Sequence, residues 1–226
     1  MTSSKDVNKE IRRIVWPALK EAGFTEFTAR SAWRRHAFAI DVLNFQSFNS
    51  YFASVDGCTT FSFGIELGVY YPPNPKVPWR RELMKPKIAE RPAGYDCPAR
   101  HSLRKTIRQP HYKRKDIWYV EPSGKNIVEV VVNARNVILS RGIPWFDDYD
   151  DPRRALDHYL KSGNNSLMAS NGSIAAALDG GALAVALGDK SAARHLWEAV
   201  IRGYAGDADV IRKAKKRIAQ IDALKI

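Results

Sequence analysis

The sequence predicts an α+β fold: an antiparallel β-sheet with helices packed on one face, followed by a C-terminal helical hairpin. Apolar residues recur at helical spacing from Lys5 to Ala22, which is typical of an amphipathic helix. Between Phe61 and Tyr71 they alternate with small and polar residues, the period of a strand with one face in the core. Helical spacing returns after Ser173. The chain therefore adds C-terminal helices to a domain that already has a sheet and helices.

The N-terminal half of the chain alternates between these two periods. The first helix is expected to end at Gly23, and Pro17 inside it removes one backbone hydrogen bond and predicts a kink. Strand periodicity starts at Ser31 and predicts a sheet of about four to six strands. The outward face of the strand that ends at Tyr71 carries only small and polar residues, so that side of the sheet should be lightly covered.

A proline-rich segment, Pro72 to Cys97, follows without helical or strand periodicity and is expected to form a long loop. Loops longer than about 15 residues in compact domains are usually functional or disordered, so this one is a natural place for a function. Two more strands are expected at Ser102–Ile107 and Ile117–Val120, on either side of a basic turn, His111–Lys115.

Helical spacing from Asn126 predicts a helix that Gly142 ends, although the β-branched run Val130–Val132 leaves a strand open. Asp151-Pro152 is typical of an N-cap followed by proline at the first helical position, and predicts a helix that ends at Lys161.

The segment Ser162–Gly172, rich in serine, asparagine and glycine, predicts a linker. We therefore expect an α+β domain over residues 1–161 and a helical hairpin region over residues 173–226. Three short helical patterns occupy that region: Ser173–Leu187, Lys190–Tyr204 and Ala208–Leu224. Asp189 and Asp207 stand at the N-cap positions of the last two.

The net charge of +12 is concentrated in one segment. Between Trp79 and Lys115, twelve Lys and Arg residues stand against three acidic residues, a local excess of +9. Such a field acts on anionic partners, and the alternative is a solvated segment that only keeps the protein soluble. The predicted polyanion-binding residues are Arg80, Arg81, Lys85, Lys87, Arg104, Lys105, Arg108, Lys113, Arg114 and Lys115.

Residue patterns of common enzyme, cofactor and metal sites are missing from the sequence. It contains no phosphate-binding loop, dinucleotide-binding or nucleophile-elbow motif. Cys58 and Cys97 lack zinc-ligand spacing and are expected to be buried thiols. The acidic run Asp147–Asp151 is better explained by a helix N-terminus than by a cation site. We therefore predict no catalytic, cofactor-binding or metal-ligating residues, and no cofactor.

The N-terminal residues have no apolar signal-peptide core, and no run of about 18 apolar residues occurs. A cytoplasmic protein without membrane association is expected.

Short motifs in a fixed order carry a resemblance. They are Gly23-Phe24, Trp33-Arg34-Arg35, Asn44-Phe45-Gln46-Ser47, Phe63-Gly64-Ile65 and Gly142-Ile143-Pro144-Trp145-Phe146. Over roughly Lys5 to Lys161, the chain resembles a bacterial family of domains of unknown function. The resemblance implies an α+β fold and no activity, since packing and turn signatures carry it.

The tail is similar to a single tetratricopeptide-like helical hairpin. Gly188-Asp189, Ala193, Trp197 and Val200 are spaced as in the turn and second helix of such a repeat, with Gly181 near the small position of its first helix. Stacked repeats need about three neighbours to bury a core, so a hairpin packed on its own domain is the alternative.

Three classes of function stay open. The leading hypothesis is a non-catalytic binding or adaptor module that meets a protein partner through the basic proline-rich loop and the helical tail. Trp79-Arg80-Arg81 and His111–Lys115 mix cations with aromatic rings, which favours weak binding of nucleic acid or another polyanion as the second hypothesis. An enzyme without a recognisable motif is the third, and requires a concave pocket with perturbed acids or histidines.

Overall fold

The computed structural model describes residues 2–37, 39–71, 90–97, 99–165, 180–185, 187–203, 206 and 208–223. The chain forms two compact units, Met1–Tyr70 with Arg91–Asp147, and Tyr71–Glu90 with Asp148–Ile226. No helix among the described residues is long and apolar enough to cross a membrane.

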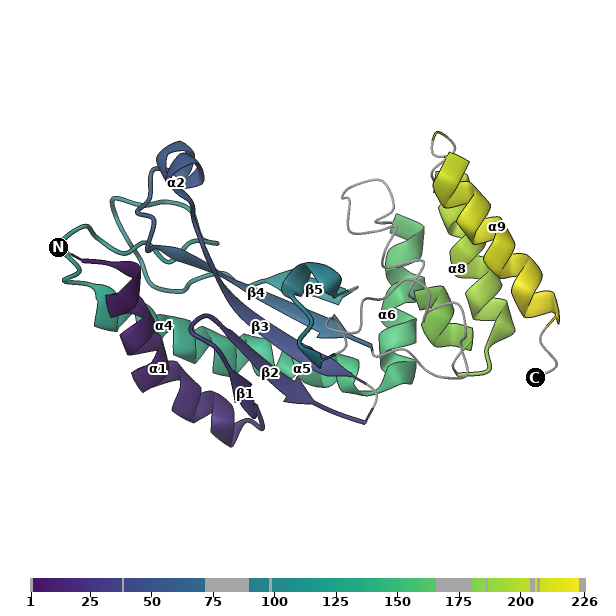
Figure 1. Ribbon diagram of the computed structural model, residues 1–226, viewed down its shortest axis with the longest axis horizontal. Helices are drawn as coiled ribbons and strands as arrows, with labels where there is room; N and C mark the ends of the chain where they lie inside the picture. Colours follow the sequence, from purple (N-terminus) through teal and green to yellow (C-terminus); the bar gives the residue numbers. More distant parts are fainter. Residues whose placement is uncertain are drawn as a thin grey trace. The chain divides into compact units, whose positions relative to one another are not determined.

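The first unit is built on a five-stranded sheet in the order β1-β2-β3-β4-β5, with every neighbouring pair antiparallel (Figure 1). The strands are β1 (Glu26–Phe27), β2 (Ser31–Arg35), β3 (Ile40–Ser47), β4 (Phe63–Tyr70) and β5 (Ala99–Ser102). The order of the strands in the sheet is their order in the sequence, as is common in antiparallel sheets. The predicted α+β class with an antiparallel sheet is confirmed.

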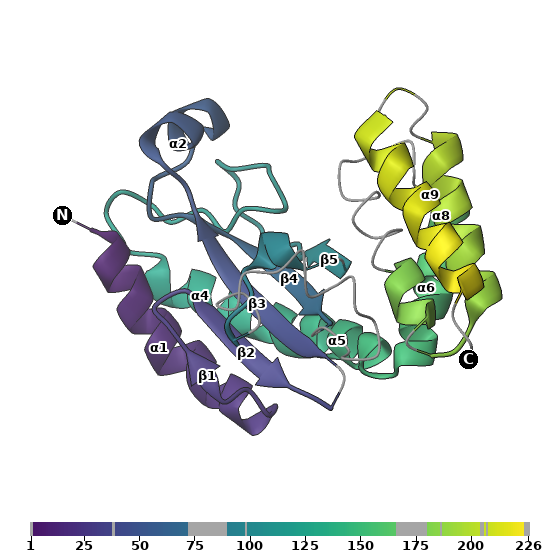
Figure 2. The same ribbon diagram turned by 45° about the vertical axis from the view of Figure 1, so that its right-hand side comes forward.

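Helices α1 (Ser4–Glu21) and α4 (Ile127–Val137) pack against each other on one face of this sheet (Figure 2). The apolar stripe of α1 is buried, and its Trp16 ring lies 5.3 Å from Phe27 and 5.6 Å from Phe45. The alternation along β3 and β4 directs Phe45 and Ile65 into the same core. The predicted packing of the first and the Asn126 helices on one face is confirmed.

Residues 91–97 cover part of the opposite face. The Trp33 indole donates a hydrogen bond to the Pro92 carbonyl at 2.9 Å, and Cys97 lies directly against Gly68. Cys97 is buried as predicted, and burial raises the pKa of its thiol. The prediction was wrong for Cys58, which is half-buried, because it follows a surface helix.

That helix, α2 (Ser50–Asp56), was not expected from the sequence. The Asn49 side chain caps it by accepting a hydrogen bond from the Phe52 backbone, and Gly57, in the left-handed region at φ 64°, ends it. Tyr51, Phe52 and Val55 are exposed, so α2 lacks the buried stripe that periodicity detects.

The helix that starts after Asn126 does not end at Gly142, contrary to the prediction. It continues through a π-helical turn, η3 (Ile138–Gly142), into α5 (Ile143–Asp150). A Cβ at Gly142 would lie 3.4 Å from Leu103 and 3.6 Å from Leu67. The glycine therefore serves close packing of the helix on the sheet, and its backbone keeps the helical conformation.

The prediction of two strands at Ser102–Ile107 and Ile117–Val120 was also wrong. β5 ends at Ser102, and residues 103–120 are irregular apart from a single bridge between Phe63 and Trp118. Side chains replace the expected ladder: the Gln109 amide accepts a hydrogen bond from the Tyr119 nitrogen and donates one to its oxygen.

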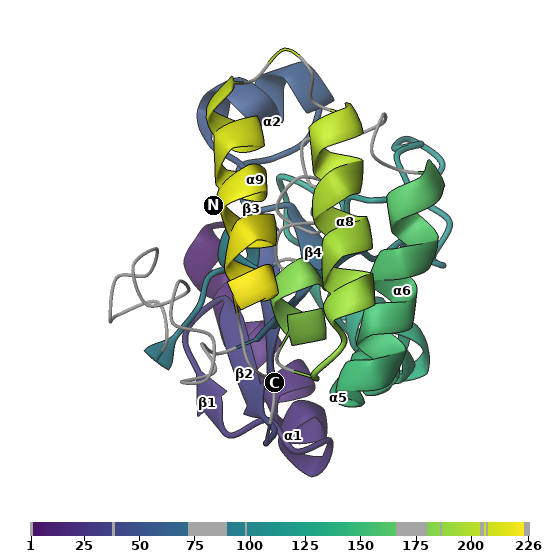
Figure 3. The same ribbon diagram turned by 90° about the vertical axis from the view of Figure 1, so that its right-hand side faces the viewer.

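The described helices of the second unit are α6 (Pro152–Asn165), residues 180–185, α8 (Lys190–Gly203) and α9 (Ala208–Ala223). Figure 3 shows α8 and α9 side by side, as in a hairpin. The predicted cap of α8 is confirmed, since the Asp189 carboxylate accepts a hydrogen bond from the Ala192 nitrogen at 2.8 Å.

The predicted N-cap of α6 is confirmed as well, because Asp151 accepts hydrogen bonds from the Arg153 and Arg154 nitrogens. α6 extends past Lys161 to Asn165, so the segment expected to be a linker starts as helix. Its residues 166–172, the start of the Ser173–Leu187 helix and the cap Asp207 lie outside the described residues. The domain boundaries and the repeat-like character of the tail stay predictions.

Replacing Gly181 with alanine is expected to destabilise the second unit by about 1–3 kcal/mol, because the added methyl group would overlap the indole of the fully buried Trp197. Gly206 is the matched control, since a Cβ there would meet nothing within 4 Å. Urea denaturation of both variants, followed by circular dichroism, checks the difference. Equal midpoints would show that Gly181 is not in close contact with Trp197.

Candidate anion-binding site

A recess of about 640 Å³ in the first unit collects basic side chains from residues 104–115 and from Arg141. We call it the basic recess. Its lining consists of Arg104, Lys105, Thr106, Ile107, Arg108, Gln109, Pro110, Tyr112, Lys113, Lys115 and Arg141. Six of these residues are cations, and no acidic residue among those that the structure describes belongs to the lining.

The wall of the recess is anchored to the sheet and to α4. The Trp118 ring is stacked on Phe63 at 6.1 Å, and the two backbones form the isolated bridge. The Trp118 indole donates a hydrogen bond to Asn133 at 2.9 Å, and the Asn133 amide donates one to the Thr106 hydroxyl at 2.8 Å. Both sides of the irregular segment are thereby tied to the same helix.

Internal hydrogen bonds hold the segment in its bent path. The Lys105 nitrogen donates to the Lys115 carbonyl at 2.7 Å, so the two ends of the loop lie together. The Lys105 ammonium donates to the Gln109 side chain and to the Tyr112 carbonyl, and lies 4.9 Å from the Tyr112 ring centre. This network places the basic side chains around the recess.

Five cations of the recess are exposed. Among the residues that the structure describes, no ion pair is formed by Arg104, Arg108, Lys113, Lys115 or Arg141. Lys105 differs from them because it is only 8% exposed, and burial lowers the pKa of its ammonium to about 8. Asp116 opposes this shift from outside the lining.

Five of the predicted polyanion-binding residues meet in the basic recess: Arg104, Lys105, Arg108, Lys113 and Lys115. Arg114 does not, because it forms ion pairs with Asp56 and with Asp116, the latter at 2.6 Å. Its hydrogen bond to Asp116 raises the pKa of the guanidinium and lowers that of the carboxyl. The remaining four, Arg80, Arg81, Lys85 and Lys87, lie outside the described residues.

Arg141 was missed from the sequence. It stands in η3, where a lone basic residue in a helical segment gives no signal of a site. The π-helical turn and the packing of Gly142 on Leu103 bring it to the recess.

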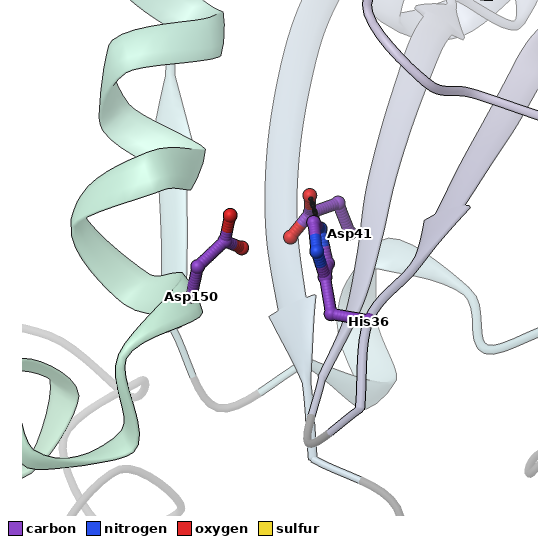
Figure 4. Close-up of side chains that lie close together, drawn as sticks. All are labelled: His36, Asp41 and Asp150. Atoms are coloured by element: carbon purple, nitrogen blue, oxygen red, sulfur yellow. Dashed lines mark hydrogen bonds and ion pairs between the residues drawn. The ribbon is translucent and has the colours of Figure 1, made fainter.

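A second polar cluster surrounds Arg34 on β2, the strand where the sequence places Trp33-Arg34-Arg35. The Arg34 guanidinium donates to Asp41 at 2.6 Å, to the Ala22 carbonyl at 3.3 Å and to Asp147 at 3.0 Å. Asp41 is completely buried, and its carboxylate oxygen also lies 2.7 Å from the Nε2 atom of His36 (Figure 4).

Aromatic rings complete the environment of Arg34. Its guanidinium carbon lies 5.5 Å from the Phe24 ring centre and 5.8 Å from that of Phe146. Gly23, at φ 89°, brings its backbone close to the Arg34 side chain. The Gly-Phe, Trp-Arg-Arg and Trp-Phe motifs thus meet around one buried cation, which is a packing role.

The motifs around Arg34 lie in a region that matches a known family. A family model described as a domain of unknown function, DUF4304, matches residues 15–148, which is more than half of the chain. The chain belongs to the DUF4304 family. No curated protein and no solved structure matches it. The DUF4304 region contains both the Arg34 cluster and the basic recess, and α8 and α9 lie beyond it.

Proposed function

We propose that this DUF4304 protein is a non-catalytic binding module that takes up polyanions in the basic recess. The observation that carries the proposal is the convergence of six cations on one recess, with no carboxylate among the described residues that line it. Like charges that are held close together repel one another, and a bound anion relieves that repulsion. Arg104, Arg108 and Arg141 add the planar donor groups that match phosphate oxygens.

A protein partner is the second candidate, and the exposed face of α2 favours it. Tyr51, Phe52 and Val55 are 69%, 54% and 66% exposed, and they form an apolar cluster on a short helix. Substituting Phe52 and Val55 with serine is expected to leave polyanion binding unchanged, since neither residue belongs to the basic recess.

Charge reversal in the basic recess tests the proposal. We expect the R104E/R108E/K113E variant to bind labelled DNA at least about tenfold more weakly than the wild type, because three exposed cations of the recess are inverted. In the wild type, affinity should fall as salt rises, with a log-log slope of about −0.9 for each duplex phosphate contacted. Fluorescence anisotropy with duplex and single-stranded DNA at several salt concentrations measures both effects.

The matched control is R212E/K215E/K216E, which makes the same charge change on α9. It should retain most of the affinity and the salt slope, since these residues do not line the recess. Equal losses in the two variants would show that net charge alone drives binding. Absence of DNA binding even at low salt would rule out nucleic acid as the polyanion, and absence of binding to any polyphosphate as well would leave the protein partner as the better candidate.

A further inference from the structure

The basic recess has the volume of a small-molecule site, and its cations come from three parts of the chain. Its volume of about 640 Å³ falls in the range of about 300–1,000 Å³ that is usual for pockets enclosing small ligands. Cations enter it from residues 104–108, from residues 113–115 and from Arg141, so they surround one volume instead of following a line.

Carboxylates lie on the other side of the loop. Residues Ile107–Tyr112 also form the wall of a second pocket of about 360 Å³, and that pocket contains Glu121 and Glu129. Beyond Lys113, Arg114 is neutralised by Asp56 and Asp116. Nucleic acid carries a charge every few ångströms along its length, so an extended strand leaving the recess toward either side would approach carboxylates or a neutralised arginine.

We infer that the basic recess binds a compact polyphosphate, several phosphoryl groups held within one small molecule, and that Lys105 takes up a proton when this ligand binds. The inference rests on the proposed polyanion-binding function and names its ligand class. No covalent step is involved: the Lys105 amine accepts a proton from solvent and donates the resulting N–H groups.

The position of Lys105 supplies the proton step. It is the buried member of the six cations, and its Nζ donates to Gln109 and to the Tyr112 carbonyl. An ammonium has three hydrogens, and these two contacts use two of them. Burial disfavours its charged form, and the charge of Asp116 opposes that effect.

The sign of the effect follows from these surroundings. Burial lowers the Lys105 pKa to about 8 in the free protein, and a bound polyanion raises it because an opposite charge favours the ammonium. At pH 8 about half of the free Lys105 is neutral, so binding should take up about half a proton. At pH 6 the uptake at Lys105 should vanish, and affinity should fall as pH rises above about 8.

Isothermal titration calorimetry with inorganic tripolyphosphate at pH 8, in buffers of different ionisation enthalpy, measures both parts. Tripolyphosphate should bind at least about tenfold more tightly than orthophosphate, and it should displace single-stranded DNA. K105R should still bind tripolyphosphate while losing the proton uptake, because arginine stays charged. K113R is the control, and should keep the uptake. Protonation of the ligand itself is common to all three proteins and cancels in the comparison.

Each outcome decides one claim. DNA binding without tripolyphosphate binding would overturn the compact ligand and keep the polyanion function, whereas binding of neither would overturn both. Equal proton uptake in the wild type and K105R would exclude Lys105 as the proton acceptor. Circular dichroism of K105R verifies its fold, and the pH dependence of wild-type affinity tests the same claim if the variant does not fold.

Discussion

Replacing Arg34 with alanine is expected to lower the free energy of unfolding by about 3–5 kcal/mol. The change leaves the completely buried Asp41 carboxylate without its guanidinium partner, and a buried charge that has lost its partner is costly. It also removes the hydrogen bonds to the Ala22 carbonyl and Asp147, which join the end of α1 and the middle of α5 to β2.

Arg34→Lys should lose much of the same stability, because a single ammonium cannot reproduce a planar group that donates in three directions. Arg13→Ala is the control at an exposed arginine with a side-chain exposure of 58%, and it should cost about 0–1 kcal/mol. Guanidinium chloride denaturation measures all three. If Arg34→Ala were as stable as Arg13→Ala, Arg34 would not organise the family motifs.

Trp118→Ala is expected to cost about 3–5 kcal/mol and to abolish polyanion binding. Trp118 is completely buried, it stacks on Phe63, and its indole donates to Asn133. Removing the ring leaves a cavity below the irregular segment and removes its hydrogen bond from Trp118 to Asn133 on α4. The cations of the basic recess should then lose their common geometry while the net charge stays the same.

Trp118→Phe separates the two effects. A phenyl ring retains much of the packing, while Asn133 loses a donor, so the cost should be about 1–3 kcal/mol and polyanion binding should persist. Thermal denaturation and the DNA titration, done on the same preparations below the melting temperature, measure both variants. Unchanged binding in folded Trp118→Ala would show that the recess does not depend on this anchor.

Several elements whose evidence is local were predicted correctly. The first helix, its end at Gly23 and the caps Asp151 and Asp189 depend on residues within about four positions of each other, which the sequence displays directly. The strict alternation from Phe61 to Tyr71 predicted a strand in the same way, and the structure has it as Phe63–Tyr70. The family motifs were visible too, although their purpose was not.

The candidate site was predicted only in part, because contacts between residues that are distant in the chain cannot be read from charge counts. Charge counting found the basic segment, and five of its cations meet in the recess. It could not separate Arg114, whose partner Asp56 is 58 positions away, or add Arg141, which a π-helical turn presents.

By itself, then, the sequence determined the class of fold, its first helix and central strands, the helix caps and the excess of positive charge. Tertiary structure alone decided that Gly142 continues a helix, that Gln109 replaces a strand ladder with side-chain bonds, and that Arg34 meets Asp147 across 113 positions. The physical reason is range. Periodicity and capping act between near neighbours in the chain, whereas ion pairing, ring stacking and the convergence of cations depend on which distant segments the folded core brings together.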